Sequence, residues 1–369
     1  MKIICEKTDL FNGINIVLKA VPTKTTMEIL DCIKIKAEDD MIILTGNDMS
    51  LGIETRIKGN IVEEGSLVVN AKIFSEMIRR LPDSEIVFSA NDTAANIRCE
   101  KTNYDIPVRS AADYPDLPVI EKKNYAIMSQ LILRDMIRQT VFSIGPDSDT
   151  MKIMTGELLE IKEKKLRLVA LDGHRISLRN VELNEEYGDR KVIIPGKTLN
   201  EMLKILSGEI DDKVVLYFSD NHILFEMENT VVLSRLIDGE YYLVDRMISS
   251  DYETLVHVNK REISDCIDRA TFLIKENEKK PLIFNISDGE VEVRLKTQLG
   301  NFDERVSIDK EGSDIKIAFN PKFLLDALKV IDDENIDIYY MNVKSPCIIK
   351  DRDETYMYLI LPVNFNDDI

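Results

Sequence analysis

The chain has 369 residues, with 48 Lys and Arg against 66 Asp and Glu, and its formal net charge at pH 7 is −18. This total excludes an ordinary groove-reading DNA-binding protein, because such proteins carry a basic excess. No apolar run approaches the roughly 18 residues of a membrane span, so no membrane association is expected. The five scattered cysteines favour structural thiols in a reducing cytoplasm. The three histidines lack metal-ligand spacing, so neither a metal nor a cofactor is expected.

The predicted elements begin with a strand-like run at residues 1–7, which lacks the long apolar core of a signal peptide. An amphipathic helix follows over Thr8–Leu18. Comparable helices are predicted over Leu133–Ser143 and Arg261–Ile274. One such helix therefore opens each third of the chain.

A second predicted helix occurs three times, at residues 72–81, 197–206 and 322–331. The copies share the pattern Lys-x-apolar-x-acid-apolar-apolar-base-x-apolar, and each begins 125 residues after the previous one. A constant offset close to one third of the chain length indicates an internal repeat. We therefore predict three domains of one architecture, at residues 1–117, 127–243 and 254–369.

Alternating apolar stretches surround each repeated helix. Before the helices lie the β-like runs Ser66–Asn70, Lys191–Pro195 and Asp314–Asn320, and three more strands with polar turns follow each helix. Two helices packed on antiparallel sheets in every repeat make this an α+β chain.

Basic residues mark one face of each repeated helix. The leading Lys and the base seven residues later lie two turns apart, which places them on the same side. These pairs are Lys72 with Arg79, Lys197 with Lys204, and Lys322 with Lys329. Each pair can be a merely solvated surface, but three equivalent faces could also form one surface that meets phosphates without reading sequence.

At this point the sequence resembles a known family, the bacterial DNA polymerase III beta subunit or replicative sliding clamp. The resemblance spans the whole chain and rests on the three-repeat layout together with four short segments. These are Met154–Leu159, Ala170–Ile176, Asn320–Phe323 and Leu361–Val363. It implies a non-enzymatic, head-to-tail homodimer whose three-domain subunits close a ring around duplex DNA. Such a ring tethers the replicative polymerase by effective concentration.

The resemblance also implies a pocket between the second and third domains that binds short, largely apolar peptides from polymerases, the clamp loader and repair proteins. Positions matching this pocket combine apolar walls with a few polar groups. They are Met154, Leu171, Gly173, His174, Arg175, Ile176, Tyr242, Arg246, Met247, Asn320, Phe323, Val343, Ser345, Ile360, Leu361, Pro362 and Val363.

Two further sets complete the expected sites. Lys24 matches a basic loop position of the family, and helix geometry supplies the other DNA-facing candidates. These are Lys72, Arg79, Arg80, Arg134, Arg138, Lys197, Lys204, Lys322 and Lys329. For the dimer contact, Phe272, Leu273 and Ile274 match a family interface segment, although each could equally be core.

The segment Asp172–Arg175 has three possible interpretations: a catalytic Asp-His pair, a bare structural turn, or the rim of the pocket. Adjacent residues on a turn rarely converge on one substrate, and no nucleophile is evident nearby. The corresponding segment of the first repeat, Gly46–Ser50, has no histidine. The pocket rim is therefore favoured, and no catalytic residue is expected.

The chain departs from the family pattern at several positions. Tyr242 replaces a rim proline, Leu171 replaces a threonine, and Asn364 replaces an arginine, so the preferred partner peptide can differ. An acidic tail follows at Phe365–Ile369. The alternatives to a sliding clamp are a repeat-built peptide-binding scaffold that does not encircle DNA and a hydrolase centred on Asp172 and His174.

Overall fold

The computed structural model describes residues 1–146, 149–248, 251–275, 278 and 280–365. The chain forms two compact units, one from Met1–Ile132 with Lys204–Leu236 and the other from Leu133–Leu203 with Ile237–Ile369. Within the described residues, no helix is long and apolar enough to cross a membrane. The predicted acidic tail at residues 366–369 lies outside the described residues.

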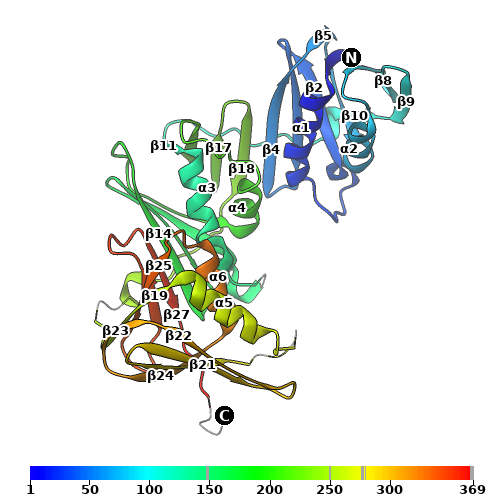
Figure 1. The fold of residues 1–369 in the computed structure, drawn as a ribbon. Helices are drawn as coiled ribbons and strands as arrows, with labels where there is room; N and C mark the ends of the chain where they lie inside the picture. The colour runs from blue at the N-terminus through cyan, green and yellow to red at the C-terminus, as the bar shows by residue number, and fades with distance from the viewer. Residues whose placement is uncertain (147–148, 249–250, 276–277, 279, 366–369) are drawn as a thin grey trace. The chain divides into compact units, whose positions relative to one another are not determined.

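The first unit holds two antiparallel sheets (Figure 1). The strand order is β5-β1-β7-β8-β9 in one and β10-β6-β2-β3-β4-β18-β17-β16-β11 in the other. Its elements are β1 (Lys2–Glu6), α1 (Lys7–Val17), β2 (Cys32–Glu38), β3 (Met41–Asn47), β4 (Leu51–Lys58), β5 (Asn60–Glu63), β6 (Gly65–Asn70), α2 (Ala71–Arg80), β7 (Glu85–Ala90), β8 (Ala94–Cys99), β9 (Thr102–Pro107), β10 (Arg109–Ser110), β11 (Tyr125–Ser129), β16 (Lys213–Phe218), β17 (His222–Glu226) and β18 (Thr230–Arg235).

Helices α1 and α2 each bury one apolar stripe and expose the other side. In α2 the buried residues are Ala71, Phe74 and Ile78, spaced three and four apart. The Asn70 side chain caps this helix by accepting the Ile73 backbone N–H at 3.0 Å. The helical period read from the sequence is therefore confirmed here.

The second unit holds a nine-stranded sheet, ordered β15-β12-β13-β14-β27-β26-β25-β19-β23, and a four-stranded sheet, ordered β22-β21-β20-β24. Its elements are β12 (Gly156–Lys162), β13 (Lys165–Leu171), β14 (Arg175–Glu182), β15 (Arg190–Pro195), α4 (Gly196–Met202), β19 (Thr254–Asn259), α5 (Lys260–Thr271), β20 (Leu282–Ser287), β21 (Glu290–Lys296), β22 (Asn301–Ser307), β23 (Asp309–Gly312), β24 (Ile315–Phe319), α6 (Pro321–Val330), β25 (Asn335–Tyr340), β26 (Cys347–Lys350) and β27 (Tyr356–Ile360).

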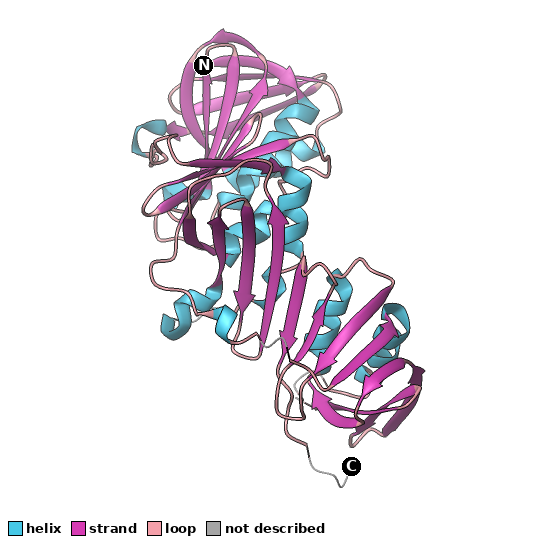
Figure 2. Cartoon of the chain, turned by 90° about the vertical axis from the view of Figure 1, so that its left-hand side faces the viewer, coloured by secondary structure: helices cyan, strands magenta, loops and turns pink. Residues whose placement is uncertain are grey.

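The larger core of this unit joins α5 and α6 to both sheets. Ile263 and Ile267 of α5 and Leu324 and Leu328 of α6 lie in one cluster with Val256 of β19. Figure 1 shows α5 and α6 beside β19, and Figure 2 shows helices lying along the strands in the part of the chain near the C-terminus. Helices packed on antiparallel sheets confirm the α+β prediction.

A smaller core lies where the segment at the end of the second repeat and just beyond it packs on the nine-stranded sheet. Tyr241 and Val244 of that segment pack with Leu171, Ile176 and strand β27. Strands β14 and β27 pair directly, with Arg175 opposite Ile360. One ladder therefore joins strands of the second and third repeats into a single sheet.

Three predicted helices end three or more residues early in the structure, and one of them, expected over Arg261–Ile274, is α5, which ends at Thr271. The helix expected over Leu133–Ser143 is α3, which runs from Gln130 to Arg138. It stops early near Thr140, whose hydroxyl donates to the Met136 carbonyl at 2.8 Å, an alternative to helical pairing. The prediction that Lys204 lies on a helix is wrong, because α4 ends at Met202.

Candidate binding site

The turn between β13 and β14 forms the centre of the candidate site. Gly173 has a φ of +86°, a conformation that favours glycine. Oδ1 of Asp172 accepts the backbone N–H groups of His174 at 3.0 Å and Arg175 at 3.1 Å. The carboxylate thus shapes the turn and binds backbone rather than orienting the His174 ring, which does not match a general-base pair.

Arg175 extends from this turn into the protein and is buried. Its Nε donates to Asp172 Oδ2 at 2.9 Å, its Nη1 to Asp326 Oδ2 at 2.7 Å, and its Nη2 to the Phe142 carbonyl at 2.7 Å. Its guanidinium carbon lies 4.5 Å from the centre of the Phe323 ring. A buried charge of this kind is stable only when paired and hydrogen-bonded, as it is here.

His174, the residue before Arg175, is exposed. Its ring stacks on Phe323 of α6, with centroids 5.9 Å apart. The His174 carbonyl accepts the backbone N–H of Leu361 at 2.9 Å, which brings the segment after β27 beside the turn. Leu361 and Val363 are 43% and 42% exposed, so apolar groups are accessible to solvent beside the turn.

Other predicted pocket residues differ in how far they are buried in the second unit. Leu171 and Ile176 are buried in the smaller core, Met154 packs against its edge, and Ile360 is buried in the larger core. Asn320 caps α6 by accepting the Lys322 backbone N–H at 3.1 Å. Exposed or partly exposed positions complete the set, namely Tyr242, Arg246, Met247, Val343, Ser345 and Pro362.

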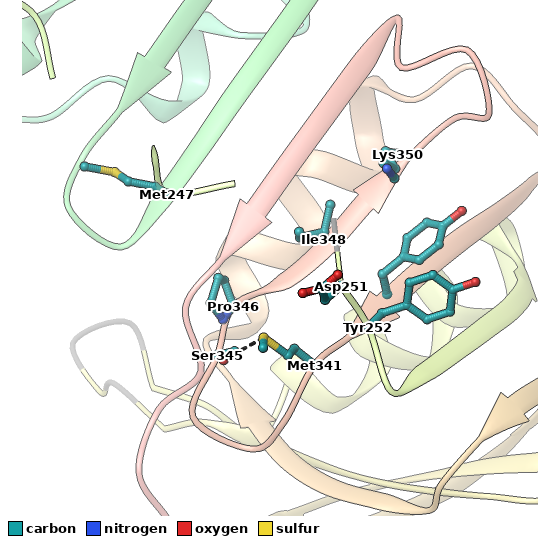
Figure 3. Close-up of a pocket in the computed structure, with 9 residues that line it drawn as sticks. Met247, Asp251, Tyr252, Met341, Ser345, Pro346, Ile348 and Lys350 are labelled. Atoms are coloured by element: carbon teal, nitrogen blue, oxygen red, sulfur yellow. Dashed lines mark hydrogen bonds between the residues drawn. The ribbon is translucent and has the colours of Figure 1, made fainter. Parts of the chain in front are cut away.

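Met247 and Ser345 also line a cavity of about 160 Å³ beside strands β25 and β26 (Figure 3). Its wall includes Tyr252, Met341 and Ile348. Ser345 Oγ lies 3.8 Å from the Met341 sulfur, and these two side chains meet in Figure 3. The predicted pocket residues thus form two groups. Met247 and Ser345 line the cavity, whereas His174, Arg175 and Phe323 lie together at the turn.

The predicted DNA-facing residues are exposed, apart from Arg138, which is half-buried. Lys72 and Arg79 lie on the exposed side of α2, opposite Phe74, and Lys322 and Lys329 are likewise exposed on α6. Arg79 and Arg80 both bond to Glu76, at 2.5 and 3.5 Å. Lys24, Arg134, Lys197 and Lys204 are also exposed.

Arg138 has a structural role in the second unit. Its Nη2 donates to Asp332 at 2.8 Å, its Nη1 to the Val330 carbonyl at 3.2 Å, and its Nε to Asp135 at 3.3 Å. Two carboxylates compensate its charge, so Arg138 is the weakest of the DNA-facing candidates. No sequence spacing indicated the contact with Asp332, because the two residues are 194 positions apart.

The predicted dimer segment divides into exposed and packed residues. Phe272, just past α5, is 86% exposed, whereas Leu273 and Ile274 pack partly against the larger core. Of the three residues, Phe272 alone presents a largely exposed apolar side chain that a partner could cover. Phe272 is therefore the strongest interface candidate of the three.

Family models match the chain almost from end to end. The N-terminal, central and C-terminal domains of the DNA polymerase III beta subunit match residues 1–118, 127–242 and 245–364. The chain belongs to this family. Within it, the chain is 33% identical to the beta sliding clamp of Halalkalibacterium halodurans, over 98% of this chain and 99% of that one. For the beta sliding clamp of Bacillus subtilis the identity is 34%, with the same two coverages.

A solved structure gives the same result for the fold. The crystal structure of a DNA polymerase III beta subunit from Eubacterium rectale is 53% identical to this chain and superposes with a TM-score of 0.95. The match covers 99% of this chain and 100% of that one. The predicted family and the three-domain clamp fold are therefore confirmed.

Sequence reasoning missed two members of the site. The centre of the Phe142 ring lies 5.4 Å from the Arg175 guanidinium carbon, and Asp326 of α6 binds the same guanidinium. Asp326 is the acidic position of the repeated helix pattern. That pattern was the only available signal, and it gave no partner for this carboxylate.

Proposed function

We propose that the chain is a sliding clamp that closes as a head-to-tail homodimer around duplex DNA and tethers the replicative polymerase. The observation that carries this proposal is the set of exposed basic residues along one face of each repeated helix or, for Lys204, just beyond its end, in a chain whose net charge is −18. Cations on these faces would meet phosphates without sequence preference, while the acidic remainder repels stray DNA. Three clamp domains, near residues 1–117, 127–243 and 254–369, would supply the repeated curvature of the ring.

We propose that partner proteins bind at the surface around His174, Phe323 and Leu361. This surface combines exposed apolar side chains with a rigid polar support, as expected for short apolar peptides. Partners would be the replicative polymerase, the clamp loader and repair proteins. The chain would act without catalysis, in keeping with an Asp172 carboxylate that binds backbone. Five cysteines without disulfides fit a place in the cytoplasm.

Loading on circular DNA tests the ring directly. The chain would be loaded onto nicked circular DNA with a clamp loader, and the DNA would then be cut once. We expect retention on the circle and loss after linearisation. Equal retention on both forms would refute a topological link. Failure to load under conditions where a related clamp loads would favour the peptide-binding scaffold.

A further inference from the structure

The acidic residue of the third repeated helix has an unusual partner. Asp326 accepts Nη1 of Arg175 at 2.7 Å, although the two residues are 151 positions apart. The exposed fractions of the two side chains are 23% and 8%. A charge pair this well shielded depends on both partners, because removing one leaves the other buried and uncompensated.

The corresponding acidic residue of the first repeat, Glu76, forms its ion pairs within its own helix. Glu76 binds Arg79 and Arg80 within α2 and stays 45% exposed. Ser50 stands in the first repeat where Arg175 stands in the second, 125 positions later, so the corresponding turn of the first repeat has no arginine at this place. The shared helix pattern therefore has a different use in the third repeat.

Asp326 lies three residues after Phe323 on α6, so the two side chains share one side of that helix. Its bond to Arg175 holds the guanidinium 4.5 Å from the centre of the Phe323 ring. His174, the residue before Arg175, stacks on the same Phe323 ring. Asp326 is thus the one carboxylate of α6 that ties the turn before β14 to the helix carrying Phe323.

We propose that Asp326 is a positioning residue of the partner-binding surface. By fixing Arg175, its carboxylate holds the rings of His174 and Phe323 in the arrangement that a partner peptide meets. This inference rests on the proposed function, because it assigns the cause of that surface's geometry. Without the Asp326 carboxylate, Asp172 would still bind Nε of Arg175, but Nη1 would lose its partner. The hydrogen bond that connects the turn to α6 would then be absent.

The test uses full-length D326N, which keeps the size of the side chain but removes its charge. The probe is a fluorescein-labelled peptide from the clamp-binding segment of the same organism's polymerase, and its affinity is read by anisotropy. We expect D326N to weaken binding by about tenfold and D326E to recover part of that loss. D332N is the matched control, because Asp332 binds Arg138 instead and should leave affinity unchanged.

Ring resonances give a second readout that does not depend on the peptide. The chain has three histidines, so the His174 ring signal can be assigned in a carbon–proton spectrum. Loss of stacking on Phe323 should shift that signal in D326N and leave His222 and His257 in place. Unchanged His174 signals together with unchanged affinity would overturn the inference.

The two failures are distinguishable. If the wild-type chain does not bind the peptide, the proposed partner surface is wrong and the inference about its geometry is overturned with it. If the wild type binds and D326N binds equally well, only the inference is wrong. A double-mutant cycle with R175M adds a further check, since D326N should cost little affinity once Arg175 is gone.

Discussion

His174 stacks on Phe323, with ring centroids 5.9 Å apart and planes inclined by 21°. The pair joins the turn of one repeat to the first helical turn of the next, and both rings belong to the predicted peptide surface. A peptide side chain seated against this pair would gain both apolar burial and aromatic contact.

We predict that F323A weakens the affinity for the labelled polymerase peptide by about 2 kcal/mol, or about thirtyfold. The reason is that both the packing surface and the support of the His174 ring disappear. Anisotropy titration measures the affinity. F11A is the control, because Phe11 lies on α1 in the first unit. Equal losses in the two variants would contradict the assignment of this surface.

Glu157 supplies a prediction about pH. It is fully buried on β12, and its Oε2 lies 2.8 Å from the Thr140 hydroxyl oxygen. Burial raises its pKa from 4.5 to about 8. Because the folded state holds the proton more tightly than the unfolded state, the contribution of Glu157 to stability is fully present below pH 4.5 and is lost as the pH rises through about 8.

We therefore expect E157Q to lose less stability than the wild type when the pH is raised from 6 to about 8.5, since glutamine has no proton to release. Thermal unfolding at several pH values measures this loss in both proteins. Between pH 6 and about 8.5 the melting temperature of the wild type should fall several degrees more than that of E157Q. E160Q, on the same strand, should keep the wild-type slope. An identical slope in E157Q and the wild type would exclude titration of Glu157 as the cause.

Phe272 supplies a prediction about assembly. F272R should convert the proposed dimer into a chain that sediments at its monomer mass of 42.3 kDa, because a charged side chain cannot be buried without a partner. Sedimentation velocity at micromolar concentration gives the answer. V119R is the control, since Val119 is 97% exposed and lies in another part of the chain. A dimer that survives F272R would remove Phe272 from the interface.

Charge reversal tests the basic helix faces. The triple variant K72E, K197E and K322E should reduce loading on circular DNA at least tenfold, because phosphate contacts are lost and repulsion is added. Reversal of Lys101, Lys164 and Lys296, which are also exposed, makes a change of equal net charge elsewhere. Loading that falls equally in both triple variants would point to net charge alone rather than to these helix faces.

The sequence predicted those elements whose signals are local. Helices α2 and α6 follow from the repeated apolar pattern within a few positions, and the structure adds the capping residues Asn70 and Asn320. The end of α3 did not follow, because it depends on the Thr140 hydroxyl, which also bonds to Glu157. Local patterns thus identify a helix more reliably than they locate its end.

The site was predictable only in part for the same reason. His174, Arg175 and Phe323 came from the family resemblance, whereas Asp326 and Phe142 required the fold to bring distant segments together. The sharing of sheets between repeats was also missed. Repeat spacing shows that units are alike, but it contains no information on pairing such as β4 with β18 or β14 with β27.

The ladder between β14 and β27 has a consequence for any attempt to study the third repeat by itself. A fragment beginning near residue 245 would lose β14, and the backbone groups of Tyr356–Ile360 that it satisfies would become an open edge. All five residues of β27 are buried in the intact chain. An apolar edge of this kind recruits other strands, so the excised domain should precipitate or pair with copies of itself.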